Sequence, residues 1–134
     1  MVFRNALGSD KKWISALLSA AGLQTWYIKD NLSNVVIFPK VGCGCLCQRD
    51  GVFEIRGLCV KKKLRGKGFG MRILKNLINK ARRKRLSMVY VRLENKNLAG
   101  FYEKFGFVAI PMRQCPVQTM MPGISVLPMR LSLV

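Results

Sequence analysis

The residues of this chain that are best suited to chemistry lie in one glycine-rich stretch, LRGKGFG at residues 64–70. Glycines let the main chain approach a ligand closely, and the N–H groups at the start of a helix are unpaired and lie at its positive end. Such a stretch between a strand and a helix predicts a site for phosphate groups. A P-loop needs four residues between its glycine and Gly-Lys-[Ser/Thr], and a dinucleotide loop needs G-x-G-x-x-G. The spacing Gly66-x-Gly68-x-Gly70 fits neither pattern, so the kind of phosphate ligand stays open at this point.

A second group with ligand chemistry consists of Cys43, Cys45 and Cys47 in the stretch GCGCLC. Alternate residues of a strand face the same way but lie roughly 6.5 Å apart, whereas a tetrahedral site holds each sulfur about 2.3 Å from one ion. The chain has no histidine, and Cys59 and Cys115 follow at no typical ligand spacing. We therefore predict no metal and interpret these cysteines as small residues on the buried face of a strand.

Positive charge is concentrated around the glycine loop. The formal net charge is +18, and half of the 24 lysines and arginines lie between residues 61 and 85, where no acidic residue occurs. Such a field attracts a polyanion: nucleic acid, an anionic membrane surface or a cofactor with several phosphates. A non-specific association with nucleic acid or a ribosome is left open for the distal cluster Lys80, Arg82, Arg83, Lys84 and Arg85.

The bulk composition limits the class of protein. A chain of 134 residues, half of them hydrophobic, is long enough for one domain with a core of its own. No apolar run reaches the roughly 18 residues of a membrane span, and the start of the chain lacks the apolar segment of a signal peptide. Five cysteines, an odd number, favour free thiols in a reducing compartment. We expect an intracellular protein, and the sequence leaves homodimer formation open.

The elements that must position the loop alternate between strand and helix patterns. An Asp50-Gly51 turn makes a hairpin of the two strands that flank it, and a helix connecting strands 52–60 and 87–93 makes those two parallel. We predict an α/β (mixed α+β) fold in which a twisted mixed sheet of about six to seven strands is flanked by about four helices. The expected strands are 2–6, 34–38, 43–48, 52–60, 87–93, 107–110 and 124–134, and the expected helices are 10–21, 25–32, 70–81 and 98–105.

Two motifs resemble the GNAT N-acetyltransferase superfamily. Its acetyl-CoA loop reads Gln or Arg, two residues, Gly, one residue, then Gly or Ala, and Arg65-Gly66-Lys67-Gly68-Phe69-Gly70 matches it in full. Family members often carry Asn and then Phe/Leu-Tyr-Glu-Lys-x-Gly-Phe. Here Asn95 stands seven residues before Tyr102, which lies in FYEKFGF at residues 101–107. The resemblance is specific over residues 52–107 and elsewhere covers only the order of elements.

This resemblance implies a single N-acetyltransferase domain over residues 1–134, with acetyl-CoA as the acetyl donor. In the family, the strand before the loop splays away from the strand after the connecting helix, and the cofactor lies in the V between them. Main-chain groups of Leu58, Cys59 and Val60, together with Asn95, are then expected to contact the pantetheine arm. The amides expected around the pyrophosphate belong to Arg65, Gly66, Lys67, Gly68, Phe69 and Gly70.

Acetyl transfer to an amine needs a base, an oxyanion donor and an acid. Glu54 is the candidate base because it stands eleven residues before Arg65, as the base does in similar histone-acetyltransferase members; an ion pair with Arg56 or another cation is the alternative. Tyr102 is the candidate acid because family tyrosines here lie near the coenzyme sulfur, and an ordinary phenol stays protonated at neutral pH. The alternative for Tyr102 is a core aromatic. An N–H group of Leu58 or Cys59 is the expected oxyanion donor.

The acceptor is an amine whose identity the sequence does not fix. In the family, the first two helices and a late hairpin form the acceptor side, which here means residues 22–33 and 112–128. They hold few charges and several apolar groups, among them Trp26, Met120 and Met121. A chain of this charge repels polycations, so we expect a neutral or acidic amine as the acceptor: a small amine, an amino acid, or a protein N-terminus or lysine. We expect the acetyl group to be transferred directly, in a ternary complex. The alternative function is a basic nucleic-acid- or ribosome-associated binding module on the same fold.

Overall fold

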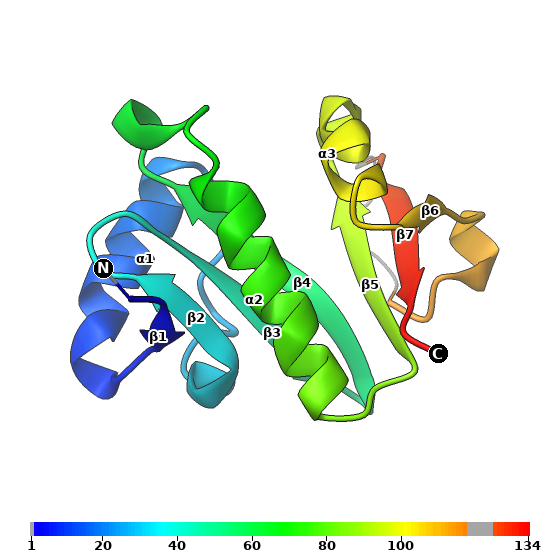
Figure 1. Ribbon diagram of the computed structural model, residues 1–134, viewed down its shortest axis with the longest axis horizontal. Coiled ribbons are helices and arrows are strands. Elements are labelled where there is room, and N and C mark those ends of the chain that lie inside the picture. The colour runs from blue at the N-terminus through cyan, green and yellow to red at the C-terminus, as the bar shows by residue number, and fades with distance from the viewer. Residues whose placement is uncertain (1, 118–124) are drawn as a thin grey trace.

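A seven-stranded sheet forms the centre of the computed structural model, which describes residues 2–117 and 125–134 (Figure 1). Its spatial order is β1-β2-β3-β4-β5-β7-β6, and β4 and β5 are the parallel pair. The other neighbouring strands run antiparallel. The strands are β1 (Arg4–Asn5), β2 (Val35–Phe38), β3 (Gly42–Arg49), β4 (Val52–Val60), β5 (Met88–Leu93), β6 (Val108–Ala109) and β7 (Leu127–Ser132).

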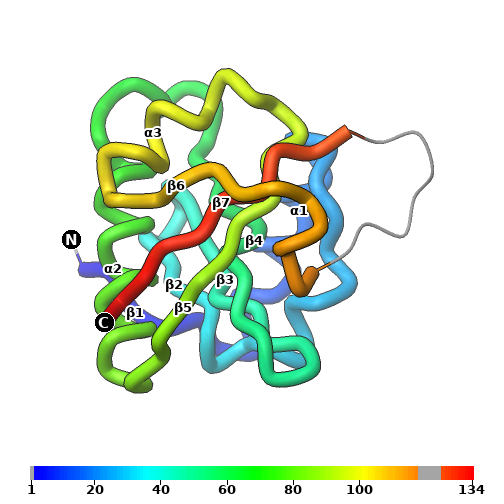
Figure 2. Tube along the Cα trace, turned by 90° about the vertical axis from the view of Figure 1, so that its right-hand side faces the viewer, coloured from blue at the N-terminus to red at the C-terminus, as the bar shows by residue number. Residues whose placement is uncertain are grey.

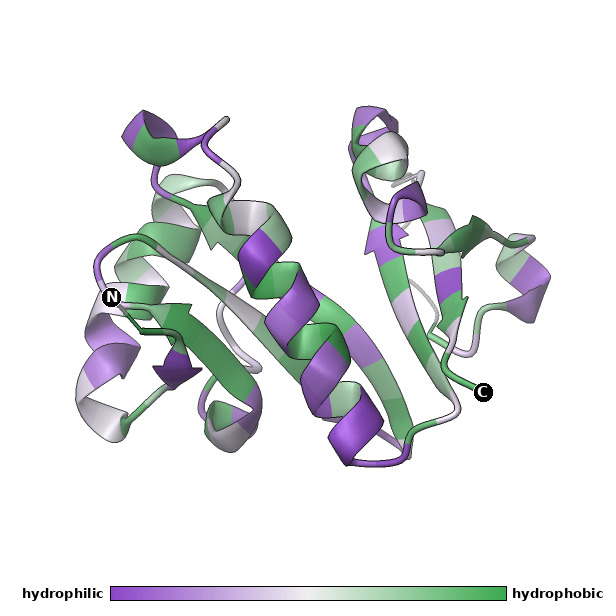
Figure 3. Cartoon of the chain, in the orientation of Figure 1, coloured by the Kyte–Doolittle hydropathy of each residue, from purple (hydrophilic) through white to green (hydrophobic). Residues whose placement is uncertain are grey.

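Helices cover both faces of this sheet. α1 (Lys11–Ala20) packs on one face and α2 (Phe69–Arg83) on the other, while the short α3 (Ala99–Glu103) lies beyond the end of β5 (Figures 1 and 2). Polar and apolar residues alternate along α2 (Figure 3), and its apolar residues Ile73, Leu74, Leu77, Ile78 and Ala81 are all buried. The predicted mixed α/β architecture with a parallel pair is confirmed. The described residues contain three α-helices where the sequence predicts about four.

The predicted helix at residues 25–32 is wrong. Two successive turns occupy this segment, closed by the N–H of Ile28 donating to the C=O of Thr25 at 3.1 Å and the N–H of Asn31 donating to the C=O of Ile28 at 3.2 Å. The Asn31 side chain donates to the C=O of Tyr27 at 2.9 Å and accepts from the N–H of Gln48 at 2.9 Å. Side-chain bonds of this kind compete with the helical ladder, and they tie the segment to β3 instead.

The predicted hairpin is confirmed between β3 and β4. Asp50 and Gly51 form its turn with φ angles of 53° and 77°, as a two-residue connection requires when its twist matches that of the strands. The other boundaries differ from the prediction mainly at element ends. β1 and β6 are two residues long, and residue 124 of the predicted last strand lies outside the described part of the chain.

The glycines and cysteines of β3 face opposite sides of the sheet. A Cβ added at Gly44 would lie 2.8 Å from Leu77 Cδ1 of α2, so the missing side chain lets α2 pack close to the strand. Cys43, Cys45 and Cys47 point the other way, where they are buried and free in the core beneath α1. Their interpretation as small buried residues is confirmed. Within the described residues, no group of three or more His, Cys, Asp or Glu is arranged to hold a metal.

Candidate functional site

The two central strands separate directly after one point of contact. β4 and β5 pair at Glu54 and Tyr90, and beyond that pair they diverge toward the ends occupied by α2 and α3 (Figure 1). Residues 55–60 of β4 therefore have no pairing partner in β5, and the main-chain groups on that edge are available to a ligand. This is the V-shaped opening that the sequence predicts, and it contains Leu58, Cys59 and Val60.

A β-bulge in β4 adjoins the opening. Cys45 pairs with Arg56 whereas Cys43 pairs with Cys59, so Gly57 and Leu58 together oppose one residue of β3. Gly57 has φ +62°, and a Cβ on it would lie only 2.5 Å from the Tyr27 hydroxyl. A bulge of this kind re-aims the side chains that flank it.

Because of the bulge, the side chains of β4 before and after it lie on opposite faces of the sheet. Glu54 and Arg56 pair with Cys47 and Cys45, so their side chains lie on the α1 face. Leu58 and Val60 instead pack with the α2 core. β4 thus presents polar side chains toward the segment around Trp26 and an open main-chain edge toward the glycine loop.

The glycine loop leaves open space at the start of α2. Gly66 and Gly68 have φ angles of +79° and +87°, and a Cβ on either would have no atom within 4 Å. Gly68 is the N-cap of α2, and its carbonyl accepts from the N–H of Arg72 at 3.2 Å. The N–H groups of Phe69, Gly70 and Met71 precede that first helical bond and point outward at the positive end of the helix. This geometry fits an anionic phosphate.

The two ends of the loop are fixed to the rest of the fold. Nε of Arg65 donates to the C=O of Val60 at 3.0 Å, so the Arg65 side chain closes the base of the loop. The Phe69 ring packs edge-on against Phe38 with centroids 5.2 Å apart. Its side chain is thus a core anchor, while its N–H faces the open space. Lys67, by contrast, is exposed.

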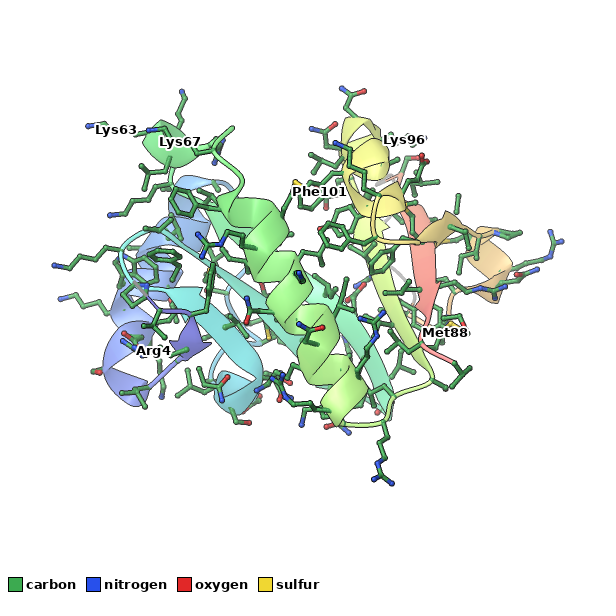
Figure 4. The ribbon with its side chains drawn as sticks, viewed as in Figure 1. Arg4, Lys63, Lys67, Met88, Lys96 and Phe101 are labelled. Carbon is green, nitrogen blue, oxygen red and sulfur yellow. The ribbon has the colours of Figure 1, made fainter. Side chains whose placement is uncertain are left out.

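Basic side chains lie at the top of both sides of the opening, around the glycine loop and above α3 (Figure 4). Lys63 and Lys67 lie above the N-terminal end of α2, and Lys96 lies above α3 (Figure 4). Phe101 of α3 extends toward α2, and its Cζ would be 3.8 Å from a Cβ placed on Gly70. Sequence reasoning gave Phe101 no role of its own, although its place directly before Tyr102 in the second motif was a usable signal.

A cleft of about 530 Å³ lies between β4, the end of β5 with the segment that follows it, and the segment around Trp26. Of the predicted site residues, it brings together Glu54, Leu58, Asn95 and Tyr102. Cys59, Val60 and the loop at residues 65–70 do not line the cleft; they lie along the continuation of the opening toward α2. The other lining residues include Gly22, Gln24, Trp26, Tyr27, Arg49, Arg56, Arg92, Glu94 and Val126.

Glu54 is buried, with 5% of its surface exposed, and it is held by two arginines. Arg92 donates to its two carboxylate oxygens from Nε at 2.5 Å and from Nη2 at 3.1 Å. Nη1 of Arg56 lies 3.5 Å from Oε1. Burial alone would lower the pKa of Arg92, but the bonds to Glu54 outweigh it and the pKa is raised. Arg92 could not be assigned from the sequence, because its place beside Glu54 depends on how β4 and β5 pair.

Tyr102 lines the cleft from α3 with its ring packed between two phenylalanines. The centroids of Phe101 and Phe107 lie 5.2 and 5.5 Å away, both edge-on. Burial raises the pKa of Tyr102 above its ordinary value, so its hydroxyl stays protonated at neutral pH and above. Asn95, on the same arm, uses its Oδ1 to accept from the N–H of Asn97 at 3.1 Å, which fixes the turn that leads into α3.

The segment that contains Trp26 and Tyr27 lines the end of the cleft away from Tyr102 and Asn95. Trp26 and Tyr27 pack edge to face, with centroids 5.6 Å apart, and the guanidinium of Arg56 lies over both rings at 5.4 and 4.8 Å. Gly22, Gln24, Trp26 and Tyr27, which belong to the segment that the family resemblance assigns to the acceptor side, thus line the cleft. Of the predicted 112–128 segment, Val126 lines the cleft, while Met120 and Met121 lie outside the described residues.

The distal basic cluster lies away from this site. Arg82, Arg83, Lys84 and Arg85 are exposed at the C-terminal end of α2, opposite the end that carries the glycine loop (Figure 1). Lys80 instead donates from Nζ to Oδ1 of Asn5 at 3.0 Å. The cluster is therefore separated from the cofactor loop by the length of the helix. Across the described residues, we also find no helix with the length and hydropathy needed to cross a membrane.

Residues 21–109 match the acetyltransferase (GNAT) domain. The chain therefore belongs to the GNAT acetyltransferase family. None of the curated proteins matches the chain in sequence.

Solved structures share this fold at low sequence identity. An N-acetylglutamate synthase from Neisseria gonorrhoeae, complexed with coenzyme A and N-acetyl-glutamate, superposes with a TM-score of 0.83 at 21% identity over 99% of this chain. This chain spans 35% of the length of that synthase. A Mycobacterium tuberculosis protein in complex with CoA gives 0.77 at 22% identity with both chains fully covered. A GNAT-family acetyltransferase from Staphylococcus aureus gives 0.79 at 16% identity over 99% of both chains.

Proposed function

We propose that this chain transfers the acetyl group of acetyl-CoA directly to a primary amine within a ternary complex. One observation carries the proposal: the open glycine loop at the start of α2 adjoins the unpaired edge of β4. Main-chain N–H groups at the open space of the loop and an unpaired strand edge thereby lead to a cleft that holds a carboxylate and a phenol. The CoA complexes of two structures with this fold add support.

Binding of acetyl-CoA is assigned to main-chain groups. The amides of residues 66–71 would hold the pyrophosphate, with Lys63, Lys67 and Lys96 supplying positive charge around it. Leu58, Cys59 and Val60 would bond the pantetheine arm along the open edge of β4, and the Nδ2 of Asn95 would contact it from the other arm. Acetyl-CoA supplies an acetyl group that is activated as a thioester.

The protons are handled by two side chains. The amine nitrogen attacks the thioester carbonyl carbon as the C–S bond breaks, and Glu54 takes the proton that the amine loses. Tyr102 donates its phenolic proton toward the departing sulfur. Because its pKa is raised, Tyr102 is always in the donor form but is a weak acid, so its main contribution is a hydrogen bond to the developing thiolate. An N–H of Leu58 or Cys59 stabilises the carbonyl oxygen.

The test is a matched pair of glycine variants, Gly68→Trp and Gly51→Trp. Both glycines have positive φ and open space around a Cβ, so backbone strain and solvent exposure are comparable. Gly51 lies in the β3–β4 turn, and only Gly68 lies in the loop. We expect Gly68→Trp to weaken CoA binding at least about a hundredfold, or roughly 2.7 kcal/mol, in isothermal titration, while Gly51→Trp leaves it near wild type.

Turnover is measured as coenzyme A release with a panel of amino acids, small amines and N-terminal peptides. Tyr102→Phe should lower the rate about tenfold, since it removes one hydrogen bond to the leaving group. Equal CoA affinity in the two tryptophan variants would contradict the assignment of the loop. Absence of acetyl transfer to every amine, with CoA bound, would contradict the transferase function.

A second candidate function is electrostatic binding to nucleic acid or a ribosome through the distal cluster. The observation that favours it is the exposure of four consecutive basic residues, Arg82 to Arg85, away from the cleft. Because the cofactor loop lies at the other end of α2, this association can coexist with catalysis.

A further inference from the structure

The acceptor end of the cleft, defined here as Gln24, Trp26, Tyr27, Arg49 and Arg56, carries more positive than negative charge. Three arginines line the whole cleft (Arg49, Arg56 and Arg92), against the two carboxylates of Glu54 and Glu94. Glu94 is exposed and directly precedes Asn95 on the cofactor side, so water solvates it. At the acceptor end, the net charge therefore depends on whether Glu54 pairs with Arg92 or with Arg56.

Glu54 is committed to Arg92 rather than to Arg56. Both of its oxygens accept from Arg92, at 2.5 and 3.1 Å, in a bidentate contact. The approach of Arg56 is longer, at 3.5 Å from a single Nη1. A bidentate carboxylate–guanidinium pair neutralises itself, so the charge of Arg56 has no full partner among the described residues.

Arg56 is nevertheless held firmly in place. Its guanidinium stacks over the rings of Tyr27 and Trp26 at 4.8 and 5.4 Å, and Nη2 donates to Oε1 of Gln24 at 3.0 Å. A guanidinium carries five N–H donors. The bond to Gln24 engages one donor on Nη2, and the ion pair with Glu54 occupies one donor on Nη1. Three donors thus remain for a ligand in a geometry that suits a carboxylate.

Arg49 adds a second cation to the same end. Its guanidinium lies 5.6 Å from the Trp26 ring, so both arginines contact one indole. Arg56 keeps only 19% of its side-chain surface exposed, and a positive charge with so little water favours an anionic partner. The same field disfavours a polyamine.

We propose that the acceptor is a primary amine that also carries a carboxylate a few bonds away, as in an α-amino acid. The proposal rests on the proposed function of the chain. The acceptor carboxylate docks on Arg56, with Arg49 at the mouth of the cleft, and the amine faces Glu54. Residues 54 and 56 are alternate residues on one face of β4, roughly 6.5 Å apart along the strand, so one small molecule can reach both.

The experiment compares α-amino acids with their own α-carboxamides, which keep the amine and the side chain but lose the negative charge. Initial rates of coenzyme A release give kcat and KM for each pair. We expect the wild-type chain to prefer the acids at least about tenfold in kcat/KM. Arg56→Gln should abolish that preference by raising KM for the acids, while CoA affinity stays unchanged.

Two further variants test whether the preference depends on the guanidinium of Arg56. Arg56→Lys keeps the charge but loses the planar fork, so it should keep part of the preference and serves if Arg56→Gln fails to fold. Arg83→Gln, on the exposed end of α2, removes the same charge elsewhere and should leave the preference intact. A wild-type chain that acetylates the amides or uncharged peptide N-termini as well as the acids would overturn this inference and leave the transferase function standing. Failure to acetylate any amine would overturn the proposed function itself.

Discussion

The two faces of the sheet differ in how they build their part of the site. On the α2 face, aliphatic side chains such as Ile73 and Leu77 pack against glycines of β3, and the groups that we propose to bind CoA are main-chain amides of one continuous loop. On the α1 face, thiols and the Tyr27 ring fill the core, and the polar groups are side chains from separated segments. A main-chain site leaves a short local signature in the sequence, whereas a side-chain site depends on the three-dimensional register.

Gly42 and Cys43 show the contrast within one strand. They are adjacent in β3, yet a Cβ on Gly42 would meet Ile73 of the α2 core at 3.0 Å, while Cys43 is buried in the α1 core. Substitutions on the α2 face should therefore alter cofactor binding, and those on the α1 face should alter acceptor use or the ionisation of the core.

The largest effect is expected from Glu54→Gln, on the α1 face. Loss of a general base should lower turnover by about 10²–10⁴-fold while CoA affinity stays near wild type. The change also leaves Arg92 without its partner, which costs up to about 3 kcal/mol of stability. Turnover per folded molecule, measured beside a denaturation curve, separates the two effects.

Glu103→Gln is the control for that measurement, since Glu103 is an exposed glutamate of α3. An unchanged turnover per folded molecule in Glu54→Gln would show that Glu54 serves only to hold Arg92.

A smaller effect, on the other face, is expected from Gly42→Ala. The added Cβ would lie 2.7 Å from the main-chain oxygen of Cys59, so β4 must shift, at a cost of about 1–3 kcal/mol. Because the shift moves the open edge of β4, CoA affinity should fall as well. Urea denaturation and a CoA titration measure the two losses, with Gly8→Ala as a control where no atom lies within 4 Å. Lost stability with unchanged affinity would argue against cofactor contacts at Cys59.

The thiols of the α1 face should make stability fall in alkaline solution. Burial, with the nearby Cys59 adding to it, raises the pKa of Cys43 from 9.0 to about 12. Its contribution is complete below pH 9, where the unfolded thiol is also protonated, and is lost as pH rises toward 12. The loss is about 1.4 kcal/mol per pH unit for each such thiol.

Denaturation curves recorded from pH 8 upward test this slope. Cys43→Ala should make it shallower, whereas Ile73→Val on the α2 face should lower stability by about 1 kcal/mol at every pH. Parallel curves for wild type and Cys43→Ala would refute the assignment.

The smallest effect on enzyme and fold is expected when Arg82, Arg83 and Arg85 are all changed to Gln. These exposed residues lie on neither face of the sheet, so stability should change by no more than about 0.5 kcal/mol for each substitution, and turnover should hold. Binding to single-stranded RNA should weaken, and the slope of log affinity against log salt should drop by about 2. A fall in CoA affinity would instead indicate that these arginines contribute to cofactor binding.

The contrast between the faces also explains what could be predicted. Local spacing in the sequence predicts the glycine loop, the Asp50-Gly51 turn and the buried apolar face of α2. The helix that connects β4 and β5 predicts that these strands are parallel. The bulge at Gly57 could not be predicted, because a lone glycine in a strand does not reveal which residue it opposes. Without the bulge, the face occupied by Glu54 and Arg56 was undetermined, and so was the partner Arg92. The turns at residues 25–32 depend on Asn31 reaching Gln48 of a distant strand.

The short strands at the two edges of the sheet bear on the behaviour of the protein at high concentration. β1 and β6 contribute two residues each, and where β7 extends past its pairing with β6, Pro128 has no N–H to offer to a further strand. Sheets with long open edges invite another chain to add a strand, and short or proline-containing edges resist it. Strong mutual repulsion at a net charge of +18 acts in the same direction. Concentrated solutions should therefore resist fibril-like aggregation, and any pairing of two copies would have to use side-chain surfaces rather than an extended sheet.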